Sequence, residues 1–174
     1  MRRIADLVHS TLHWKQPRVF ESRYELLSGD EVAGTLSFRS AFGSFATAET
    51  ADGSWTFKRV GFWQTRATVR ELGAQSDLAV FEHNTWSGGG TLTMAGGRTI
   101  RVTTNFWQSR IEFQLEDGTV LFRYRTEGFM RHEAGLDIEP AAARMPELPW
   151  MLGFGWYLVV MMHHDAASTA VIVS

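Results

Sequence analysis

Apolar and polar residues alternate along short runs between residues 18 and 127 of the chain. Near the end of this region, Val120 and Phe122 fall on one face, whereas Arg123 and Arg125 fall on the other. Alternation with a period of two residues is typical of antiparallel strands that have one buried and one solvated face. The pattern therefore predicts a series of half-buried strands.

Turn-forming sequences separate these runs at short intervals, for example Asp52-Gly53, Gly96-Gly97 and Asp117-Gly118. Glycine tolerates positive φ, and aspartate bonds back to its own backbone, so both favour tight turns. Many strands that are joined by short turns and are apolar on one face close into a barrel or fold over into a sandwich. The sequence predicts a mainly β domain with its strands within residues 16–139.

The alternation gives way to the run LPWMLGFGWYLVVMM, residues 148–162, which contains no charged residue. Pro149 suits the first turn of a helix, and His163 and His164 suit the last turn. We therefore predict a helix over residues 147–163. Because apolar residues occupy every side of this helix, it requires apolar surroundings all round, which are either lipid or the inside of a closed barrel.

The length of the run favours the inside of a barrel. Fifteen residues in a helix span roughly 23 Å, which is shorter than the hydrocarbon core of about 30 Å. Gly153 and Gly155 each cost about 1 kcal/mol relative to alanine in a helix, and we interpret them as places where a strand approaches closely. We predict that the helix is the core, and that its core side chains are Trp150, Leu152, Phe154, Trp156, Tyr157 and Leu158.

The whole chain of 174 residues fits a single domain, residues 1–174. Residues 1–15 have apolar positions at helical spacing and are predicted to form a weak helix or a tail. Residues 166–174 are predicted to form a tail or a short strand.

Composition narrows the classes of function. The chain has no cysteine, which excludes disulfides, thiolate nucleophiles and zinc-thiolate sites and fits a reducing cytoplasm. A net charge of −2 argues against nucleic acid as a partner. Asp6 and His9 interrupt what would have to be the apolar core of a signal peptide. We expect a cytoplasmic protein that is peripheral at the membrane.

Candidate chemistry is sparse. His9 and His13 are four residues apart, which suits a metal on a helix, but the glutamate of the HExxH pattern is missing. We interpret 163–165, which is His-His-Asp, as the end of the helix. The glycine-rich segment 88–97 lacks the spacing of phosphate-binding loops and is interpreted as two hairpin turns. We expect no catalytic residues, no metal and no cofactor.

Two aromatic pairs, Phe62-Trp63 and Phe106-Trp107, break the alternation. Adjacent residues on a strand point to opposite faces, so one ring of each pair would face outward. These rings would either form a patch that contacts a membrane or a partner, or lie at strand ends that loops cover.

Three segments, 52–70, 88–125 and 146–162, resemble small bacterial members of the tubby-like superfamily, which includes tubby carboxy-terminal domains, phospholipid scramblases and LURP-one-related proteins. The resemblance leaves out residues 1–15 and 166–174. It implies a closed antiparallel barrel of about twelve strands that encloses the hydrophobic helix. It also implies a non-enzymatic binding module, because tubby domains bind phosphoinositide headgroups through basic residues on the barrel surface.

The resemblance implies an anionic membrane surface or a protein as the partner of this module. The exposed basic residues that we assign to lipid binding are Lys58, Arg101, Arg123 and Arg125. Two alternatives remain. One is a tail-anchored membrane protein that uses 148–162 as its anchor. The other is a lipocalin-like carrier of a small hydrophobic ligand, which the GxW-like sequence 53–55 suggests.

Overall fold

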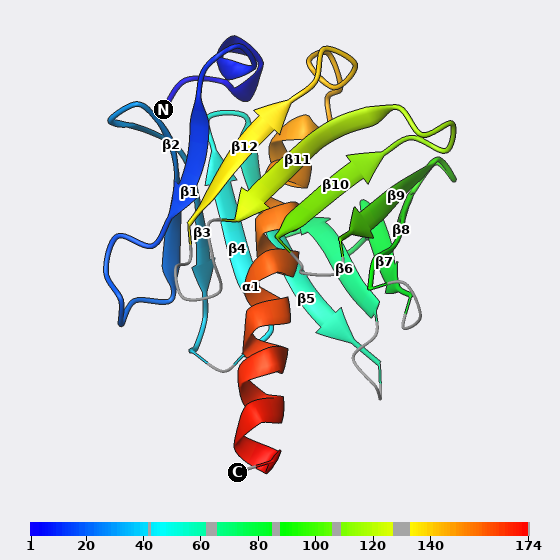
Figure 1. The fold of residues 1–174 in the computed structure, drawn as a ribbon. Helices are drawn as coiled ribbons and strands as arrows, with labels where there is room; N and C mark the ends of the chain where they lie inside the picture. Colours follow the sequence, from blue (N-terminus) through cyan, green and yellow to red (C-terminus); the bar gives the residue numbers. More distant parts are fainter. Residues whose placement is uncertain (42, 62–65, 85–87, 106–108, 127–132, 174) are drawn as a thin grey trace.

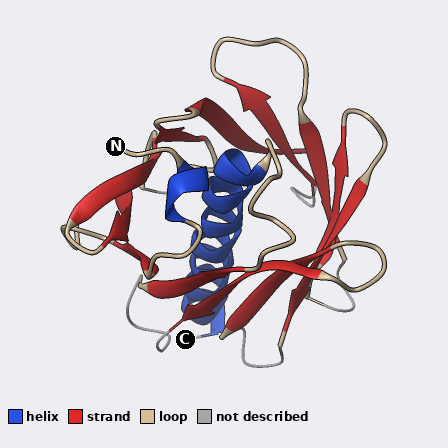
Figure 2. Cartoon of the chain, turned by 90° about the horizontal axis from the view of Figure 1, so that it is seen from above, coloured by secondary structure: helices blue, strands red, loops and turns tan. Residues whose placement is uncertain are grey.

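The computed structural model is a closed β-barrel with a helix running through it (Figures 1 and 2). It describes residues 1–173 apart from 42, 62–65, 85–87, 106–108 and 127–132, with side chains described as far as Thr169. The mainly β architecture predicted from the alternating pattern is confirmed, as is the closure into a barrel.

Twelve antiparallel strands form the barrel wall. They are β1 (Leu12–Lys15), β2 (Arg23–Ser28), β3 (Glu31–Phe38), β4 (Ala46–Thr50), β5 (Gly53–Val60), β6 (Arg66–Glu71), β7 (Ala79–His83), β8 (Gly90–Met94), β9 (Thr99–Thr104), β10 (Arg110–Gln114), β11 (Val120–Thr126) and β12 (Ala134–Ile138). Each strand pairs with its neighbours in the sequence, and β1 pairs with β12 to close the sheet. Closure leaves every strand with two partners, so the barrel has no open edge.

Burial alternates along most of the strands as their sequences predict, although β2, β3 and β11 contain consecutive buried residues. In β8, Leu92 and Met94 are buried, whereas Thr91 and Thr93 face the solvent. The turn into β11 contains Gly118 with a φ of 87°, a conformation that glycine adopts without strain. Each strand therefore has an apolar inner face, and these faces must pack against further apolar side chains inside the barrel.

The helix α1 (Leu148–Val173) supplies the apolar side chains that fill the barrel. All side chains from Leu148 to Met161 are buried, including the six predicted core residues, whose exposed fractions are 8% or less. The segment 148–162, which the anchor hypothesis assigned to lipid, thus lies inside the barrel. In the part of the chain that the structure describes, no helix has the length and hydropathy needed to cross a membrane.

The two glycines of α1 lie where strands approach the helix, as predicted. A Cβ atom on Gly153 would lie 2.9 Å from the Cβ of Ala48 on β4. A Cβ atom on Gly155 would lie 2.5 Å from Cε2 of Tyr124 on β11. Real Cβ atoms hardly ever approach so closely, so a side chain at either position would force the neighbouring strand residue to shift.

Aromatic rings and two tyrosine hydroxyls fix the helix to the wall. Trp156 of α1 stacks on Trp14 of β1, with ring centroids 5.7 Å apart. The hydroxyl of Tyr124 donates to the carbonyl of Leu152, and the hydroxyl of Tyr157 donates to a main-chain carbonyl next to β4 at 2.7 Å. Burial raises the pKa of both tyrosines, so their hydroxyls stay protonated and act as donors.

Three sequence predictions about the ends of the chain are corrected. The helix does not end near residue 163 but continues to Val173, so a tail or short strand over 166–174 is wrong. No glycine or proline follows Gly155, and alanines continue the helix. His163 and His164 therefore lie within the helix and do not cap its carboxy terminus.

The amino-terminal prediction is also corrected. Only Ile4–Leu7 is helical, as a short 3-10 turn, whereas Leu12–Lys15 forms β1. The apolar residues at helical spacing are instead shared between a turn that contributes Ile4 and Leu7 to the core and a strand that buries Leu12. A strand of four residues is too short to show a clear alternating pattern in the sequence.

The helix gives the barrel two distinct ends (Figure 1). At the entry end α1 begins, and β2, β4, β6, β8, β10 and β12 end there. At the exit end α1 leaves the barrel and continues beyond it, and β1, β3, β5, β7, β9 and β11 end there.

Candidate functional site

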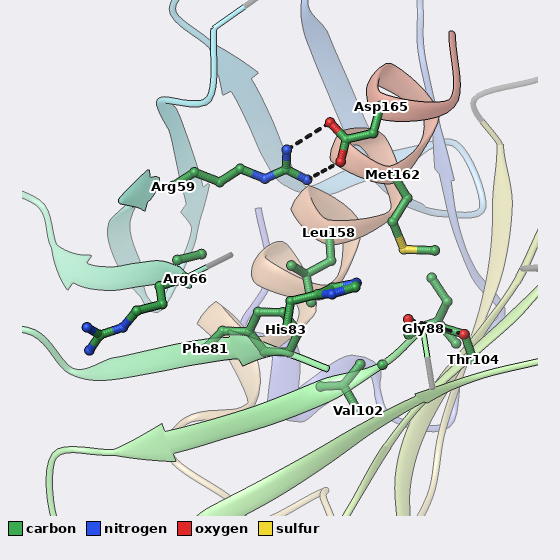
Figure 3. Close-up of a pocket in the computed structure, with 13 residues that line it drawn as sticks. Arg59, Arg66, Phe81, His83, Gly88, Val102, Thr104, Leu158, Met162 and Asp165 are labelled. Carbon is green, nitrogen blue, oxygen red and sulfur yellow. Dashed lines mark hydrogen bonds and ion pairs between the residues drawn. The ribbon is translucent and has the colours of Figure 1, made fainter. Parts of the chain in front are cut away.

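A cavity of about 470 Å³ lies at the exit end, between α1 and the wall formed by β5 to β10 (Figure 3). The helix makes its most extensive wall contacts with β3, β4 and β5, so the opposite wall is less fully covered where the helix leaves. We call this space the exit cavity. Its lining comprises Arg59, Arg66, Ala67, Phe81, His83, Gly88, Gly89, Val102, Thr104, Ile111, Leu158, Met162 and Asp165.

The inner part of the exit cavity is apolar. Phe81, Val102 and Ile111 point inward from three different strands and are almost fully buried. Leu158 and Met162, one helical turn apart on α1, form the facing surface. These side chains come from the alternating pattern of the strands and from the apolar run of the helix, which the barrel brings together.

Glycines at the start of β8 shape one wall of the cavity. A Cβ atom on Gly89 would lie 2.1 Å from the carbonyl oxygen of Val102, and one on Gly90 would lie 2.4 Å from the Phe81 ring. The glycines therefore allow β8 to pass close to its neighbours. Gly96 and Gly97 form the turn after β8, so the glycine-rich segment 88–97 serves strand packing and turn formation.

An ion pair spans the mouth of the cavity. The guanidinium of Arg59, the last residue but one of β5, donates two hydrogen bonds of 2.9 and 2.7 Å to the Asp165 carboxylate on α1. The Arg59 side chain is only 17% exposed, whereas that of Asp165 is 58% exposed. A bidentate pair of this kind is stronger and more directional than a single ionic contact.

Two histidines lie beside this pair. The pKa of His83 is lowered by partial burial and by the positive charge of Arg59, although Asp165 acts in the opposite direction. The pKa of His164 is lowered mainly by partial burial, and again Arg59 and Asp165 act in opposite directions. Both imidazoles are therefore neutral at pH 7, and Arg59 and Arg66 are the cations at the mouth.

The structure does not bring the four predicted lipid-binding residues together. Lys58 is exposed on β5, four strands away from Arg101 on β9 in the barrel order. Arg123 and Arg125 share the outer face of β11, but both are paired with carboxylates. Arg123 contacts Glu112 and Glu139, and Arg125 contacts Asp137.

The aromatic pairs Phe62-Trp63 and Phe106-Trp107 lie outside the described residues, so the hypothesis of an outward aromatic patch stays a prediction. His9 and His13 line a second hollow of about 610 Å³ beside β1 and β12. Within the described part of the chain, no group of three histidine, aspartate or glutamate side chains is arranged to hold a metal ion.

Sequence reasoning missed the exit cavity. Arg59 and Asp165 are 106 residues apart, and only the closed barrel with its central helix brings them together. One signal was present in the sequence, because Asp165 is the first charged residue after the apolar run. An acidic side chain just beyond a buried helix marks the point where the helix meets solvent and needs a polar partner.

Comparison with protein-family models, with curated protein sequences and with solved structures gives no match. The similarity to the tubby-like superfamily therefore rests on the sequence pattern alone and stays a prediction.

Proposed function

We propose that this protein is a non-enzymatic barrel that binds anionic phospholipid surfaces through its exit end. The observation that carries the proposal is the separation of charge along the barrel axis. Basic residues outnumber acidic residues at the exit end, where the described carboxylates include Glu21, Glu82, Glu133 and Asp165, and acidic residues outnumber basic residues in the turns of the entry end. A molecule with such a dipole approaches an anionic surface with its basic end first.

Strand ends supply the basic residues of the exit end. Described basic residues in or next to the exit-end residues of the strands are Lys15, Arg18, Arg23, Arg39, Lys58, Arg59, Arg66, Arg110 and Arg125. Of these, Arg18, Arg23, Arg59, Arg66 and Arg125 are paired with carboxylates, whereas Lys15, Arg39, Lys58 and Arg110 form no ion pair within the described residues. The guanidinium of Arg39 instead lies 5.3 Å from the centre of the Phe45 ring. Lys15, Arg39, Lys58 and Arg110 are available to lipid phosphates.

The entry end has the opposite character. Its turns and the adjoining strand ends carry the carboxylates Asp30, Glu31, Asp52, Glu71, Asp77, Glu116, Asp117, Glu139 and Glu147. Three basic residues of this end, Arg2, Arg70 and Arg98, are engaged by carboxylates. The entry end would be repelled by an anionic membrane.

The exit end also carries exposed apolar side chains that can insert into a membrane. In the connection between β1 and β2, the side chains of Val19 and Phe20 are 80% and 101% exposed. A Lys or Arg near an anionic leaflet contributes about 1 kcal/mol, and full burial of a phenylalanine side chain contributes about 1.5–3 kcal/mol. Four cations and one inserted ring are thus sufficient for measurable, reversible binding to a membrane.

The experiment is co-sedimentation of the purified protein with vesicles of phosphatidylcholine, with and without phosphatidylserine. We expect binding only to vesicles that contain phosphatidylserine, and less binding as salt is added, because salt screens exposed charges over about 10 Å at 0.1 M. The double variant Arg39→Gln/Arg110→Gln should bind more weakly at low salt. The variant Phe20→Ser should bind more weakly at every salt concentration.

Matched variants at the entry end serve as controls. Arg3→Gln/Arg144→Gln removes two exposed cations, and Leu72→Ser removes an exposed apolar side chain. Both variants should bind like the unmodified protein. Equal losses at the two ends would refute the orientation, and failure to bind phosphatidylserine at low salt would refute membrane binding and leave an acidic protein as the partner of the basic end.

A further inference from the structure

We propose that the exit cavity binds a medium-chain aliphatic carboxylate, whose chain fills the apolar part of the cavity while its carboxylate takes the place of Asp165 on Arg59. This inference concerns the inside of the barrel mouth and does not depend on membrane binding by the outer surface.

The size and lining of the cavity favour a small apolar ligand. A volume of about 470 Å³ lies within the range of about 300–1,000 Å³ in which proteins hold small molecules. Val102, Ile111, Leu158 and Met162 present mostly aliphatic surface from two strands and the helix. Flexible methionine side chains adapt to chains of different shape, so a saturated hydrocarbon chain suits this lining.

The polar groups of the cavity gather at its mouth and single out a carboxylate. Arg59 is the enclosed member of its ion pair, and Asp165 is the exposed member. The planar guanidinium presents two donors at a spacing that matches the two oxygens of a carboxylate. Asp165 therefore occupies a position at which the carboxylate of a ligand finds the same two hydrogen bonds.

The other polar groups at the mouth are less suited to this role. His83 is neutral at pH 7, because partial burial lowers its pKa, and offers no positive charge to a carboxylate. The Thr104 hydroxyl donates to the carbonyl of Gly88 at 3.2 Å, so its proton is already used. Arg66 lies at the rim and is 3.4 Å from Glu82, with both side chains largely exposed. Arg59 is consequently the recognition group, and Asp165 is a competitor within the protein that holds it in place when the cavity is empty (Figure 3).

A displacement experiment with two ligands of equal length tests the proposal without vesicles. The neutral fluorophore N-phenyl-1-naphthylamine reports occupation of the cavity, and decanoate or decanol displaces it at concentrations below micelle formation. We expect both ligands to displace the fluorophore, and decanoate to do so at a lower concentration. The variant Arg59→Gln should raise the decanoate concentration needed at least tenfold and leave that of decanol unchanged.

Removal of the Asp165 carboxylate, which competes with the ligand for Arg59, should have the opposite effect on decanoate binding. Asp165→Asn should lower the decanoate concentration needed severalfold, again without effect on decanol. Lys58→Gln is the matched control, because Lys58 is next to Arg59 on the same strand and faces the solvent. This variant should leave the concentrations of decanoate and decanol needed for displacement unchanged. Met162→Trp fills the cavity from the half-buried side of the helix and should abolish displacement by both ligands.

Two outcomes overturn the proposal. One is equal displacement by decanoate and decanol that Arg59→Gln leaves unchanged, which would show that the guanidinium does not contact the ligand. The other is retention of full binding by Met162→Trp and by a second filling variant, Ala67→Leu on the strand side, which would place the ligand elsewhere. Circular dichroism of each variant confirms that loss of binding is not loss of folding.

Discussion

The substitution Gly155→Ala tests whether the barrel wall determines the sequence of the helix. In an isolated helix this change is stabilising by about 1 kcal/mol, because glycine has more backbone freedom to lose. In the barrel the new methyl group would lie 2.5 Å from Cε2, 2.7 Å from the hydroxyl and 2.9 Å from Cζ of Tyr124. Tyr124 is fully buried, so its ring has little room to move away.

The expected magnitude follows from three contributions. Overpacking of a core costs about 1–3 kcal/mol. A shift of the Tyr124 ring weakens its hydrogen bond to Leu152, which is worth about 0.5–1.5 kcal/mol. The gain of about 1 kcal/mol in helix propensity offsets part of this cost. The free energy of unfolding should therefore fall by about 2 kcal/mol, which lowers the melting temperature by about 4–8 °C in a domain of this size.

Urea and thermal unfolding monitored by circular dichroism measure this change. The control is Ala167→Gly on the exposed part of the same helix, which should cost at most about 1 kcal/mol through helix propensity alone. In a Tyr124→Leu background the cost of Gly155→Ala should shrink by about 1 kcal/mol or more, because the contacting atoms are gone. If Gly155→Ala instead stabilises the protein, the close approach of β11 to the helix is refuted.

Three further predictions concern the same interior. Leu152→Asp places an unpaired charge at a site that is 1% exposed and should abolish the cooperative urea transition, because such a charge costs several kcal/mol; a normal transition would contradict the central position of the helix. Tyr157→Phe keeps the ring but loses a hydrogen bond, and the urea midpoint should fall by the equivalent of about 1 kcal/mol. Because the pKa values of His83 and His164 are lowered in the folded protein, the unfolded chain takes up protons first on acidification. Stability should therefore be fully present above the ordinary histidine pKa of about 6.5 and fall as the pH drops below it. A double glutamine variant of both histidines should flatten this profile, and an unchanged profile would assign the pH dependence to other groups.

The barrel and its contents could be predicted from the sequence because two simple periodicities carry the information. Alternating strands that close into a barrel must pack their apolar inner faces against other apolar side chains. A helix that is apolar all round must itself be surrounded by apolar side chains. Gly153 and Gly155 even indicated where the two meet. These features depend on local patterns of a few residues, which the sequence displays directly.

The errors and omissions have a different physical origin. The far end of the helix was misplaced because His163 and His164 suit a helix terminus, although helix-forming alanines follow them. The four basic residues were grouped from the family resemblance and their expected exposure, which do not reveal that Arg123 and Arg125 are paired with carboxylates; their role in lipid binding stays a prediction. Neither the pairing across strands nor the contact between Arg59 and Asp165 is encoded by local spacing.

The position of the helix in the chain has a consequence for how the protein is made. Every strand of the wall precedes the helix in the sequence. The ribosome therefore synthesises all the strands before it synthesises residues 148–161, whose side chains fill the core. Until those residues emerge, the apolar inner faces of the strands have nothing to pack against and are exposed to self-association. Folding of the barrel is therefore expected to wait for its last element, and synthesis that stops before Leu148 should yield an aggregating chain rather than a hollow barrel.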